Sequence, residues 1–406
     1  MLGKEFKMFL NRLFQRNPEF IQSAIELHQA DLLPANSYVL DLDTMQKNAG
    51  LMAAEGERLG LKVFPMTKQI GRNPYALDYL AKEGLNAFVA VDMNCALTIH
   101  KNGYDIGHLG HLVQIPKAEV ETAAVMKPYY WTVFNRENAQ AAAGATRKIG
   151  QKQPFLARIF AEGDIFYMGH EGGFHAEEIL EVADYLDSLP GGIFSGITTF
   201  PALLYNPETK KAERTPNMST LEKAASKLKK AGREGIEVNA PGTTSTKVMG
   251  LLADAGATQV EPGHGLTGTT PLHAVEDLPE TPAILYVSEI SHKYSGKPYC
   301  FGGGLYIDPV FPEYDVRALI GNTPKTAFRQ ELSVTMPPAN AIDYYGIVSK
   351  EGSQNVMIGD SVVFGFRPQA FVTRAYVSAV SGINNGQPKV EGVFTTNGRK
   401  TNWPEW

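Results

Sequence analysis

A lysine ends a short apolar segment of this chain, Lys62-Val-Phe-Pro-Met-Thr-Lys68. The segment predicts a strand that carries Lys68 at its C-terminal edge, which is where (β/α) barrels place their reactive groups. A lysine in a barrel mouth loses contact with water, and this disfavours its ammonium form and makes the amine a usable nucleophile. The alternative is a surface lysine at a strand end, and position alone does not decide between the two.

Two turns rich in glycine and threonine could hold a phosphate. The first is Gly242-Thr-Thr-Ser-Thr246, and the second lies within Val260-Glu-Pro-Gly-His-Gly-Leu-Thr-Gly-Thr-Thr-Pro271. Glycines let backbone N–H groups approach an anion, hydroxyls add donors, and barrel phosphate sites often use the last two βα loops. The candidate contacts are Thr243, Thr244, Ser245, Gly263, Gly265, Thr267, Gly268 and Thr269. Helix N-capping is the simpler explanation of the first turn.

An amine nucleophile and a phosphate cradle at the ends of different strands suit a phosphate cofactor held as a Schiff base. The sequence therefore predicts pyridoxal 5'-phosphate (PLP), with Lys68 as its attachment point. An unrelated barrel enzyme, in which Lys68 forms a Schiff base with the aldehyde of a sugar phosphate, is the alternative.

The elements that must position these residues follow a βα period. Predicted strands, separated by helical segments, cover residues 38–42, 63–67, 87–91, 112–115, 130–134, 155–160, 192–197, 236–239 and 259–261. Their number and spacing predict an α/β fold with a (β/α)8 barrel. A doubly wound sheet is the alternative, but no Gly-x-Gly-x-x-Gly turn follows the first strand. We expect a helical segment at 1–36, the barrel at 37–281 and a β-rich domain at 282–406.

Composition and charge limit the classes of partner. The hydrophobic content of 43% and charged content of 20% are ordinary for a globular protein. A net charge of -5 gives no reason to expect nucleic acid or an anionic membrane as a partner. Two cysteines are too few for a disulfide framework, and no run of transmembrane length occurs. We therefore expect a cytoplasmic protein that acts on a small molecule.

The segments Ser37-Tyr-Val-Leu-Asp-Leu-Asp-Thr-Met-Gln-Lys-Asn48 and Val63-Phe-Pro-Met-Thr-Lys68 resemble the opening of fold-type III PLP-dependent enzymes. This is the family of the alanine racemase N-terminal domain, and the chain is most similar to its YhfX-like members. The resemblance covers about residues 38–271. It implies that Lys68 forms the internal aldimine, that both turns contact the phosphate, and that the chain has a C-terminal β-domain and forms a homodimer.

Glu261 departs from the alanine racemase pattern. In alanine racemases an arginine stands before the Pro-Gly of the phosphate loop, whereas related decarboxylases have a glutamate there. A carboxylate keeps the pyridine nitrogen protonated, so that the ring can accept the electrons of a carbanion. Glu261 is therefore a candidate cofactor contact, and a surface carboxylate at a strand end is the alternative.

Further site residues follow from the same resemblance. A racemase needs a second acid or base on the ring face opposite the lysine, supplied in alanine racemases by a tyrosine of the partner's β-domain. The candidates are Tyr294, which we take as the first choice, Tyr306, Tyr344 and Tyr345. His170 is a candidate to stack on the cofactor ring. Arg158 lies within a predicted strand, where it would hydrogen-bond the ring or balance Glu162.

Three histidines and a cysteine raise the question of a metal. His292 and Cys300, with Asp308 nearby, could imitate the ligands of related metal-dependent lyases, but their spacing fits no standard signature. His108 and His111 precede the predicted strand 112–115, which would place them at the stabilising bottom face of the barrel. We therefore expect no metal.

The function predicted from these residues is a PLP-dependent amino-acid racemase or epimerase that works through a Lys68 Schiff base and a Cα carbanion. A lyase or aldolase of the D-threonine aldolase or D-serine dehydratase type is the alternative, because the same carbanion serves both. A PLP-binding protein without turnover is a second alternative, against which the long β-domain argues.

Overall fold

The computed structural model describes residues 8–308, 314–338 and 340–405, and these divide into two compact units. One, called here the barrel unit, comprises Gly50–Thr67 and Ala81–Gly265. The other, the β-unit, comprises Met1–Ala49, Lys68–Leu80 and Leu266–Trp406. The three-part division predicted from sequence describes order along the chain and stays a prediction, whereas these units group residues by contact.

The barrel unit is built on eight parallel strands in one curled sheet. In sheet order they are β2 (Lys62–Val63), β12 (Gln259–Val260), β11 (Glu237–Asn239), β8 (Gly192–Thr198), β6 (Gln153–Phe160), β5 (Tyr130–Val133), β4 (Asp105–Leu109) and β3 (Ala87–Ala90). Met66, just after β2, pairs with Val89 in β3. Because β2 also pairs with β12, the two ends of the sheet meet.

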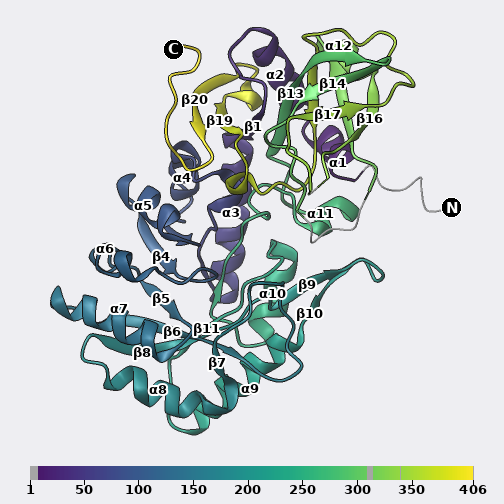
Figure 1. Cartoon of the computed structure of the whole chain (residues 1–406). Helices are drawn as coiled ribbons and strands as arrows, with labels where there is room; N and C mark the ends of the chain where they lie inside the picture. The colour runs from purple at the N-terminus through teal and green to yellow at the C-terminus, as the bar shows by residue number, and fades with distance from the viewer. Residues whose placement is uncertain (1–7, 309–313, 339, 406) are drawn as a thin grey trace. The chain divides into compact units, whose positions relative to one another are not determined.

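Helices follow the strands and lie around them (Figure 1). They are α5 (Met93–Lys101), α6 (Val120–Val125), α7 (Arg136–Lys148), α8 (Ile179–Ser188), α9 (Pro216–Lys230) and α10 (Thr246–Asp254), with short 3-10 turns at Lys117–Glu119 and Ala176–Glu178. In α7, Asn135 caps the first turn by accepting a hydrogen bond from Asn138 N at 2.8 Å. Its buried residues Ala139, Ala142, Ala143 and Thr146 recur at helical spacing. Two small additions are β7 (Phe174–His175), beside β6, and the hairpin of β9 (Leu203–Asn206) and β10 (Lys211–Arg214).

The β-unit contains an antiparallel ring of six strands. Around the ring they are β13 (Ile284–Tyr294), β14 (Lys297–Phe301), β17 (Tyr345–Val348), β16 (Glu331–Thr335), β15 (Arg317–Gly321) and β18 (Ser361–Phe364). The ring closes because β13 pairs with both β14 and β18. From β13 the sheet continues through β1 (Ser37–Asp41), β19 (Tyr376–Ser381) and β20 (Lys389–Thr395).

Two N-terminal helices pack on this unit. The helices α1 (Met8–Arg16) and α2 (Pro18–Gln29) meet at Asn17, directly before a proline that occupies the first position of α2. Their apolar faces share a core with β1, β13 and β18, which includes Leu13, Phe20, Ile25, Val39, Leu285 and Val363. The remaining helices are α3 (Leu42–Leu59), α4 (Pro74–Ala81), α11 (Pro271–Val275) and α12 (Pro324–Ala327), with 3-10 turns at Lys68–Ile70, Ala370–Val372 and Ile383–Asn385.

The predicted fold class, an α/β barrel with a C-terminal β-rich domain, is confirmed. Three predicted strands differ from the structure in their position, their length or the sheet to which they belong. The first forms, as β1, yet it pairs with β13 and β19 rather than with the barrel. The fourth is β4 at Asp105–Leu109 and not residues 112–115, because Gly107 and His108 interrupt its apolar pattern. The second shortens to β2, and Lys68 begins a 3-10 turn. Among the described residues, no helix is long and apolar enough to cross a membrane.

Candidate active site

Glu261 is the centre of a buried polar cluster in the barrel unit. It follows β12 directly, and its side chain is 1% exposed. His108 Nδ1 donates a hydrogen bond to its Oε1, and Asn239 Nδ2 donates to the same oxygen at 2.9 Å. Its Oε2 is buried and has no hydrogen-bond partner among the residues the structure describes, and His111 Nε2 lies 3.6 Å from it. One carboxylate oxygen is thus held by two hydrogen bonds, whereas the other lies in an ion pair with His111 and makes no hydrogen bond to a described residue.

The partners of Glu261 are themselves held by neighbouring strands. His108 Nε2 lies 2.5 Å from the hydroxyl of Thr132 on β5, and Thr198, the last residue of β8, donates to Asn239 Oδ1 at 2.7 Å. Asn239 ends β11 and His108 lies near the end of β4. Because parallel strands of a barrel share one C-terminal end, the cluster lies where barrel enzymes carry out their chemistry.

The cluster keeps Glu261 ionised. Burial alone would raise the pKa of Glu261, but the charges of His111 and His108, with the hydrogen bonds from His108 and Asn239, outweigh it and lower the pKa to about 2. A charged carboxylate with one open oxygen can hold a proton on a ring nitrogen or share in binding a cation.

The expectation that His108 and His111 belong to the bottom face was wrong. It depended on the misplaced strand at 112–115, whereas His108 lies within β4 and His111 two residues beyond its end. Both side chains face Glu261. Their i, i+3 spacing was visible in the sequence, but the polar character of β4 concealed which end of the strand they occupy.

His108, His111 and Glu261 could also hold a metal ion, because one ligand atom from each lies within 4.8 Å of the others. Imidazole nitrogens and a carboxylate oxygen are ligands that zinc accepts. A metal bound to His108 would have to displace its contact with either Thr132 or Glu261, since both ring nitrogens are engaged.

Arg158 and His170 meet beside this cluster. Arg158, on β6, is 1% exposed and donates to the backbone oxygens of His170 at 2.6 Å and His111 at 3.5 Å. Burial, only partly offset by Glu171, lowers the pKa of Arg158 to about 10. The His170 ring packs against Tyr167 and Phe200, which also contacts His111 edge-on. The two predicted residues are therefore joined, and the aromatic group around them was not predicted.

The turn at Gly242–Thr246 presents a buried hydroxyl at a helix N-terminus. Ser245 is the N-cap residue of α10 but makes no capping bond, and no described residue hydrogen-bonds its buried Oγ. Gly242 has φ +138°, and a Cβ on Gly265 would lie 2.4 Å from Thr244 O. The backbone is thus packed so closely that glycine is required at both turns. N-capping therefore does not explain Ser245.

The other predicted site residues lie in the β-unit. Lys68 Nζ lies 5.6 Å from the centre of the Phe371 ring. Thr267 and Thr269 are buried and their hydroxyls lie 2.8 Å apart, and Gly268 has φ +61°. Of the predicted phosphate contacts, Thr243, Thr244, Ser245, Gly263 and Gly265 belong to the barrel unit and Thr267, Gly268 and Thr269 to the β-unit.

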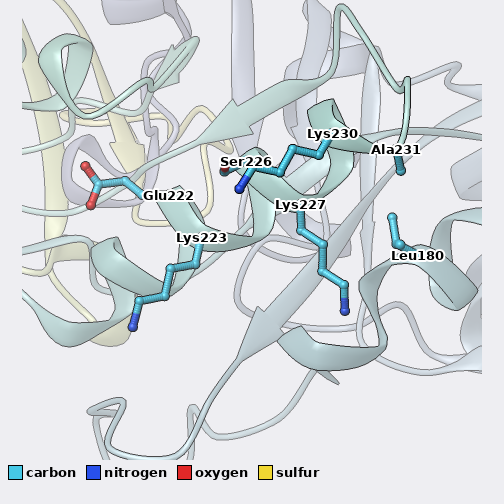
Figure 2. Close-up of a pocket in the computed structure, with 7 residues that line it drawn as sticks. All are labelled: Leu180, Glu222, Lys223, Ser226, Lys227, Lys230 and Ala231. Atoms are coloured by element: carbon cyan, nitrogen blue, oxygen red, sulfur yellow. The ribbon is translucent and has the colours of Figure 1, made fainter.

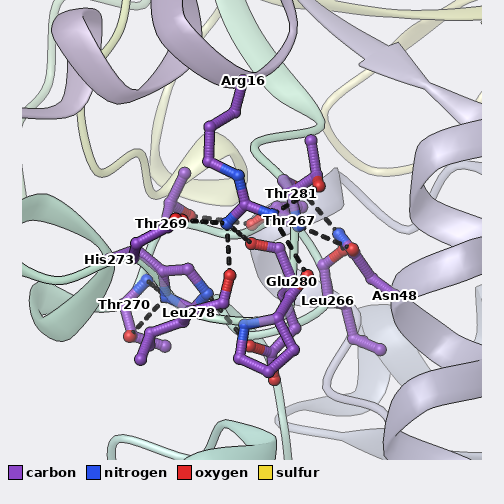
Figure 3. A network of polar contacts seen from close by, with 12 residues as sticks. Arg16, Asn48, Leu266, Thr267, Thr269, Thr270, His273, Leu278, Glu280 and Thr281 are labelled. Carbon is purple, nitrogen blue, oxygen red and sulfur yellow. Dashed lines mark hydrogen bonds and ion pairs between the residues drawn. The ribbon is translucent and has the colours of Figure 1, made fainter.

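A polar network anchors the segment that contains Thr267 and Thr269 (Figure 3). Arg16 points into residues 278–281 and donates to Glu280 O at 3.2 Å and to Thr281 Oγ1 at 3.2 Å. Asn48 donates to Leu266 O at 3.0 Å and to Thr281 O at 2.8 Å. These bonds give the second half of the predicted phosphate loop a fixed course.

Tyr294, the predicted second acid or base, ends β13 and is 69% exposed. His292 stacks on Tyr299 and Cys300 is fully buried, so these two residues take part in packing. Asp308 instead contacts Arg367 and Gln369.

A hollow on the outer wall of the barrel unit is separate from this site. Figure 2 shows it between α8 and α9, lined by Leu180, Glu222 and the lysines 223, 227 and 230. Lys227, Lys229 and Lys230 are exposed, as a solvated helix face requires. The hollow contains none of the predicted site residues.

Comparison with known proteins extends over most of the chain. The alanine racemase N-terminal domain family matches residues 40–271, and the YhfX-like C-terminal domain family matches residues 285–390. The chain is 36% identical to YhfX of Escherichia coli over 391 residues, which cover 96% of this chain and 99% of that protein.

Solved structures with a similar fold include three enzymes. D-threonine aldolase from Filomicrobium marinum has a TM-score of 0.68 at 14% identity, covering 91% of this chain and 96% of the aldolase. Alanine racemase from Clostridium difficile 630 has a TM-score of 0.62 at 17% identity, covering 89% and 98%. D-threo-3-hydroxyaspartate dehydratase from Delftia sp. HT23 has a TM-score of 0.62 at 15% identity, covering 88% and 97%. At these identities the likeness shows the fold.

Proposed function

Because this chain belongs to the alanine racemase N-terminal domain family, whose members depend on PLP, we propose that it is a PLP-dependent amino-acid racemase or epimerase. The observation that supports the cofactor is Glu261, a buried and ionised carboxylate whose Oε2 no described residue hydrogen-bonds, and such a carboxylate suits any reaction through a Cα carbanion. A carboxylate in that state is suited to a protonated ring nitrogen.

The residues present fit PLP at both of its polar ends. Glu261 Oε2 supplies an acceptor for the ring N–H. The Ser245 hydroxyl, buried without a partner among the described residues at the start of α10, supplies a donor for the phosphate. The helix N-terminus adds backbone N–H groups and a favourable dipole. Gly242 and Gly265 have no room for a side chain, because a Cβ would lie 2.7 Å from Leu203 O and 2.4 Å from Thr244 O.

When bound, PLP withdraws the electron pair left at Cα after a bond to that atom is broken. Glu261 would hold the proton on the ring nitrogen, and its low pKa keeps it able to do so throughout the physiological range. His108 and Asn239 would fix the carboxylate by engaging Oε1. Arg158 and His170 would line the ring, and Thr243, Thr244, Ser245, Gly263, Gly265, Thr267, Gly268 and Thr269 would surround the phosphate.

Lys68 would hold the cofactor through its aldehyde carbon and then exchange the Cα proton of the substrate on one side. A second group must serve the opposite side in a racemase. We propose Tyr294, whose exposed position on β13 leaves it accessible to the site of a second copy in a homodimer.

Proton NMR in D2O tests the activity directly. The PLP-loaded protein is incubated with a panel of D- and L-amino acids, and we expect deuterium at Cα followed by the other enantiomer. Lys68→Ala should abolish both the exchange and the visible absorption band of the bound cofactor. Arg317→Ala, at an arginine of the β-unit outside the site, is the matched control.

Other outcomes identify other chemistry. New products without the opposite enantiomer would contradict the racemase and indicate a lyase or aldolase. A bound cofactor with no exchange across the panel would indicate a PLP-binding protein without turnover. Zinc found in stoichiometric amount, together with no PLP uptake, would instead assign His108, His111 and Glu261 to a metal.

A further inference from the structure

A second set of polar side chains lies on one face of a short ribbon in the β-unit. Residues 306–308 and 367–369 run antiparallel, with Ile307 opposite Pro368 and Asp308 N donating to Arg367 O at 3.1 Å. In such a ribbon the residues that flank the central pair project together from the other face. That face carries a phenol, a carboxylate, a guanidinium and an amide, those of Tyr306, Asp308, Arg367 and Gln369. We call this set the Arg367 ribbon.

Asp308 orients the other members of the ribbon. Its side chain is almost fully buried, its Oδ1 lies 2.5 Å from Arg367 Nη1, and its Oδ2 accepts a hydrogen bond from Gln369. Burial and then the charge of Asp308 raise the pKa of Tyr306, which agrees with a phenol close to the carboxylate. One carboxylate therefore holds the guanidinium and the amide side by side.

Arg367 keeps part of its binding capacity open. Its side chain is 11% exposed, and its buried Nε has no hydrogen-bond partner in the part of the chain that the structure describes. Asp308 forms an ion pair with Nη1, although Nη1 too makes no hydrogen bond to a described residue, and the edge formed by Nε and Nη2 lies outside that ion pair. That edge of a guanidinium matches the two oxygens of a carboxylate.

Arg317 shows what a purely structural arginine looks like in the same unit. Its Nε donates to Glu331 Oε1, its Nη1 to Asp315 at 3.1 Å and Ser333 at 2.9 Å, and its Nη2 to the Glu331 carbonyl at 3.1 Å. Every nitrogen has an acceptor. The Arg367 side chain is less exposed than that of Arg317 and yet makes fewer hydrogen bonds. This is unusual for a largely buried charge unless a ligand supplies the missing acceptors.

The ribbon continues into the segment that contacts Lys68. Gln369 is followed by the 3-10 turn Ala370–Val372, whose Phe371 ring lies 5.6 Å from Lys68 Nζ and 5.6 Å from Arg72 Cζ. The open edge of Arg367 is thus four residues along the chain from a contact of the predicted nucleophile, within one compact unit.

We propose that Arg367 binds a carboxylate of the amino-acid substrate, with Asp308 and Gln369 as positioning residues. The proposal rests on the proposed function, because it assumes that the substrate amine reaches Lys68. The carboxylate is either the α-carboxylate or one on the side chain, and the same guanidinium edge would bind either.

Spectral titration of the PLP-loaded protein tests this site by binding rather than turnover. The probes are ethylamine, which has no carboxylate, alanine, which has one, and aspartate, which has two. In Arg367→Gln we expect the affinity for aspartate to fall by about 10- to 100-fold while ethylamine is unaffected, since hydrogen bonds to charged groups are each worth about 1.5–3 kcal/mol. Loss for alanine as well assigns the α-carboxylate, and loss for aspartate alone assigns a side-chain carboxylate.

The controls separate binding from folding. Arg317→Gln should leave all three affinities unchanged. If Arg367→Gln fails to fold because Asp308 loses its ion-pair partner, the double variant Asp308→Asn/Arg367→Gln removes both charges and serves in its place. A loss of thermal stability with unchanged affinities for alanine and aspartate would overturn the carboxylate site and leave a structural ion pair. A wild-type protein whose spectrum responds to no amine would instead overturn the proposed function, and this inference with it.

Discussion

Two glutamates, Glu237 partly buried and Glu261 buried, lie at opposite ends of the same barrel and have opposite hydrogen-bonding environments. At the N-terminal end, Glu237 begins β11, and both of its oxygens are used. Oε1 accepts from Lys62 and from Tyr130 at 2.8 Å, and Oε2 accepts from Thr258 at 2.6 Å. At the C-terminal end, Glu261 has two donors on Oε1 and none among the described residues on Oε2.

The two glutamates differ in the end of the barrel that they occupy. The strand β11 begins with Glu237 and ends with Asn239, a donor to Glu261, so one strand supplies both clusters. A carboxylate with all its acceptor sites filled contributes to stability and can do little else. A buried oxygen left open is costly unless a ligand completes it, and barrels place such groups at the C-terminal end. The contrast supports the proposal that Glu261 takes part in the chemistry, whereas Glu237 contributes to stability.

The largest effect is expected for Glu261→Gln, which tests the difference in role between Glu261 and Glu237. Glutamine keeps the size of the side chain but cannot hold a proton on the ring nitrogen, so we expect kcat to fall by about 10²- to 10³-fold, the loss typical of removing one preorganised electrostatic contact. Steady-state kinetics of the PLP-loaded variant measures it. The matched variant Glu237→Gln should leave kcat unchanged. Equal losses of activity in both variants would show that the two ends do not differ in role.

A smaller loss should follow from releasing the fixed oxygen of Glu261. His108→Leu removes one of the two donors to Oε1 and leaves Asn239 as the other, and we expect kcat to fall by about 10- to 100-fold, as for partners that orient an active-site ligand. His108→Asn restores an N–H donor and should recover part of the rate. The pH profile of kcat should change in His108→Leu and not in His108→Asn. If His108 served only for packing, neither variant would change that profile.

Much of this architecture follows from the sequence, because strand and helix periods and turn residues are local. Local pattern identified most barrel strands, and the Asn17-Pro18 break between the first two helices is local too. Local pattern did not identify β4. Its residues Gly107 and His108 interrupt the apolar pattern of a strand, and His108 is buried only because of tertiary contacts such as that with Glu261. The partner of β1 also could not be read from its residues, since Val39 suits either sheet.

The site was predictable in part for the same reason. Glu261 and Ser245 were predicted as cofactor contacts because they adjoin recognisable glycine and threonine turns, and these roles stay predictions. His108 was discounted because its role depends on Glu261, about 150 residues later in the chain. Arg367 gave no signal at all, since an arginine beside a proline is ordinary until its ribbon partner Asp308 is known.

Ser245→Ala tests the hydroxyl that we propose as a donor to the cofactor phosphate. Because this hydroxyl caps no backbone N–H, its loss should hardly change stability, whereas we expect the affinity for PLP to fall by about 10-fold, the effect of one hydrogen bond to a charged group. Equilibrium titration with PLP and thermal unfolding measure the two quantities. Asn135→Ala is the converse control, because Asn135 does cap its helix. It should cost about 1 kcal/mol of stability and leave PLP affinity unchanged.

The smallest expected effect concerns the stabilising end alone. The pKa of Glu237 is lowered from its ordinary value of 4.5, because the hydrogen bonds from Lys62, Thr258 and Tyr130 outweigh its burial, which would raise it. A carboxyl with a lowered pKa in the folded state contributes stability that is present above its ordinary pKa and is lost as the pH falls through the lowered value. Glu237→Gln should therefore cost about 1 kcal/mol at neutral pH, reduced by the exposure of Lys62, and progressively less below about pH 4.5.

Urea unfolding of the wild type and Glu237→Gln across this range measures the difference in the free energy of unfolding. For Glu261→Gln, any charge-dependent difference in the free energy of unfolding should persist to lower pH, since the pKa of Glu261 is about 2. A difference for Glu237→Gln that stays constant with pH would mean that hydrogen-bond geometry, rather than charge, is what this carboxylate contributes. That result would overturn the predicted pH dependence of Glu237, and the contrast between the two glutamates would then depend on their hydrogen bonds alone.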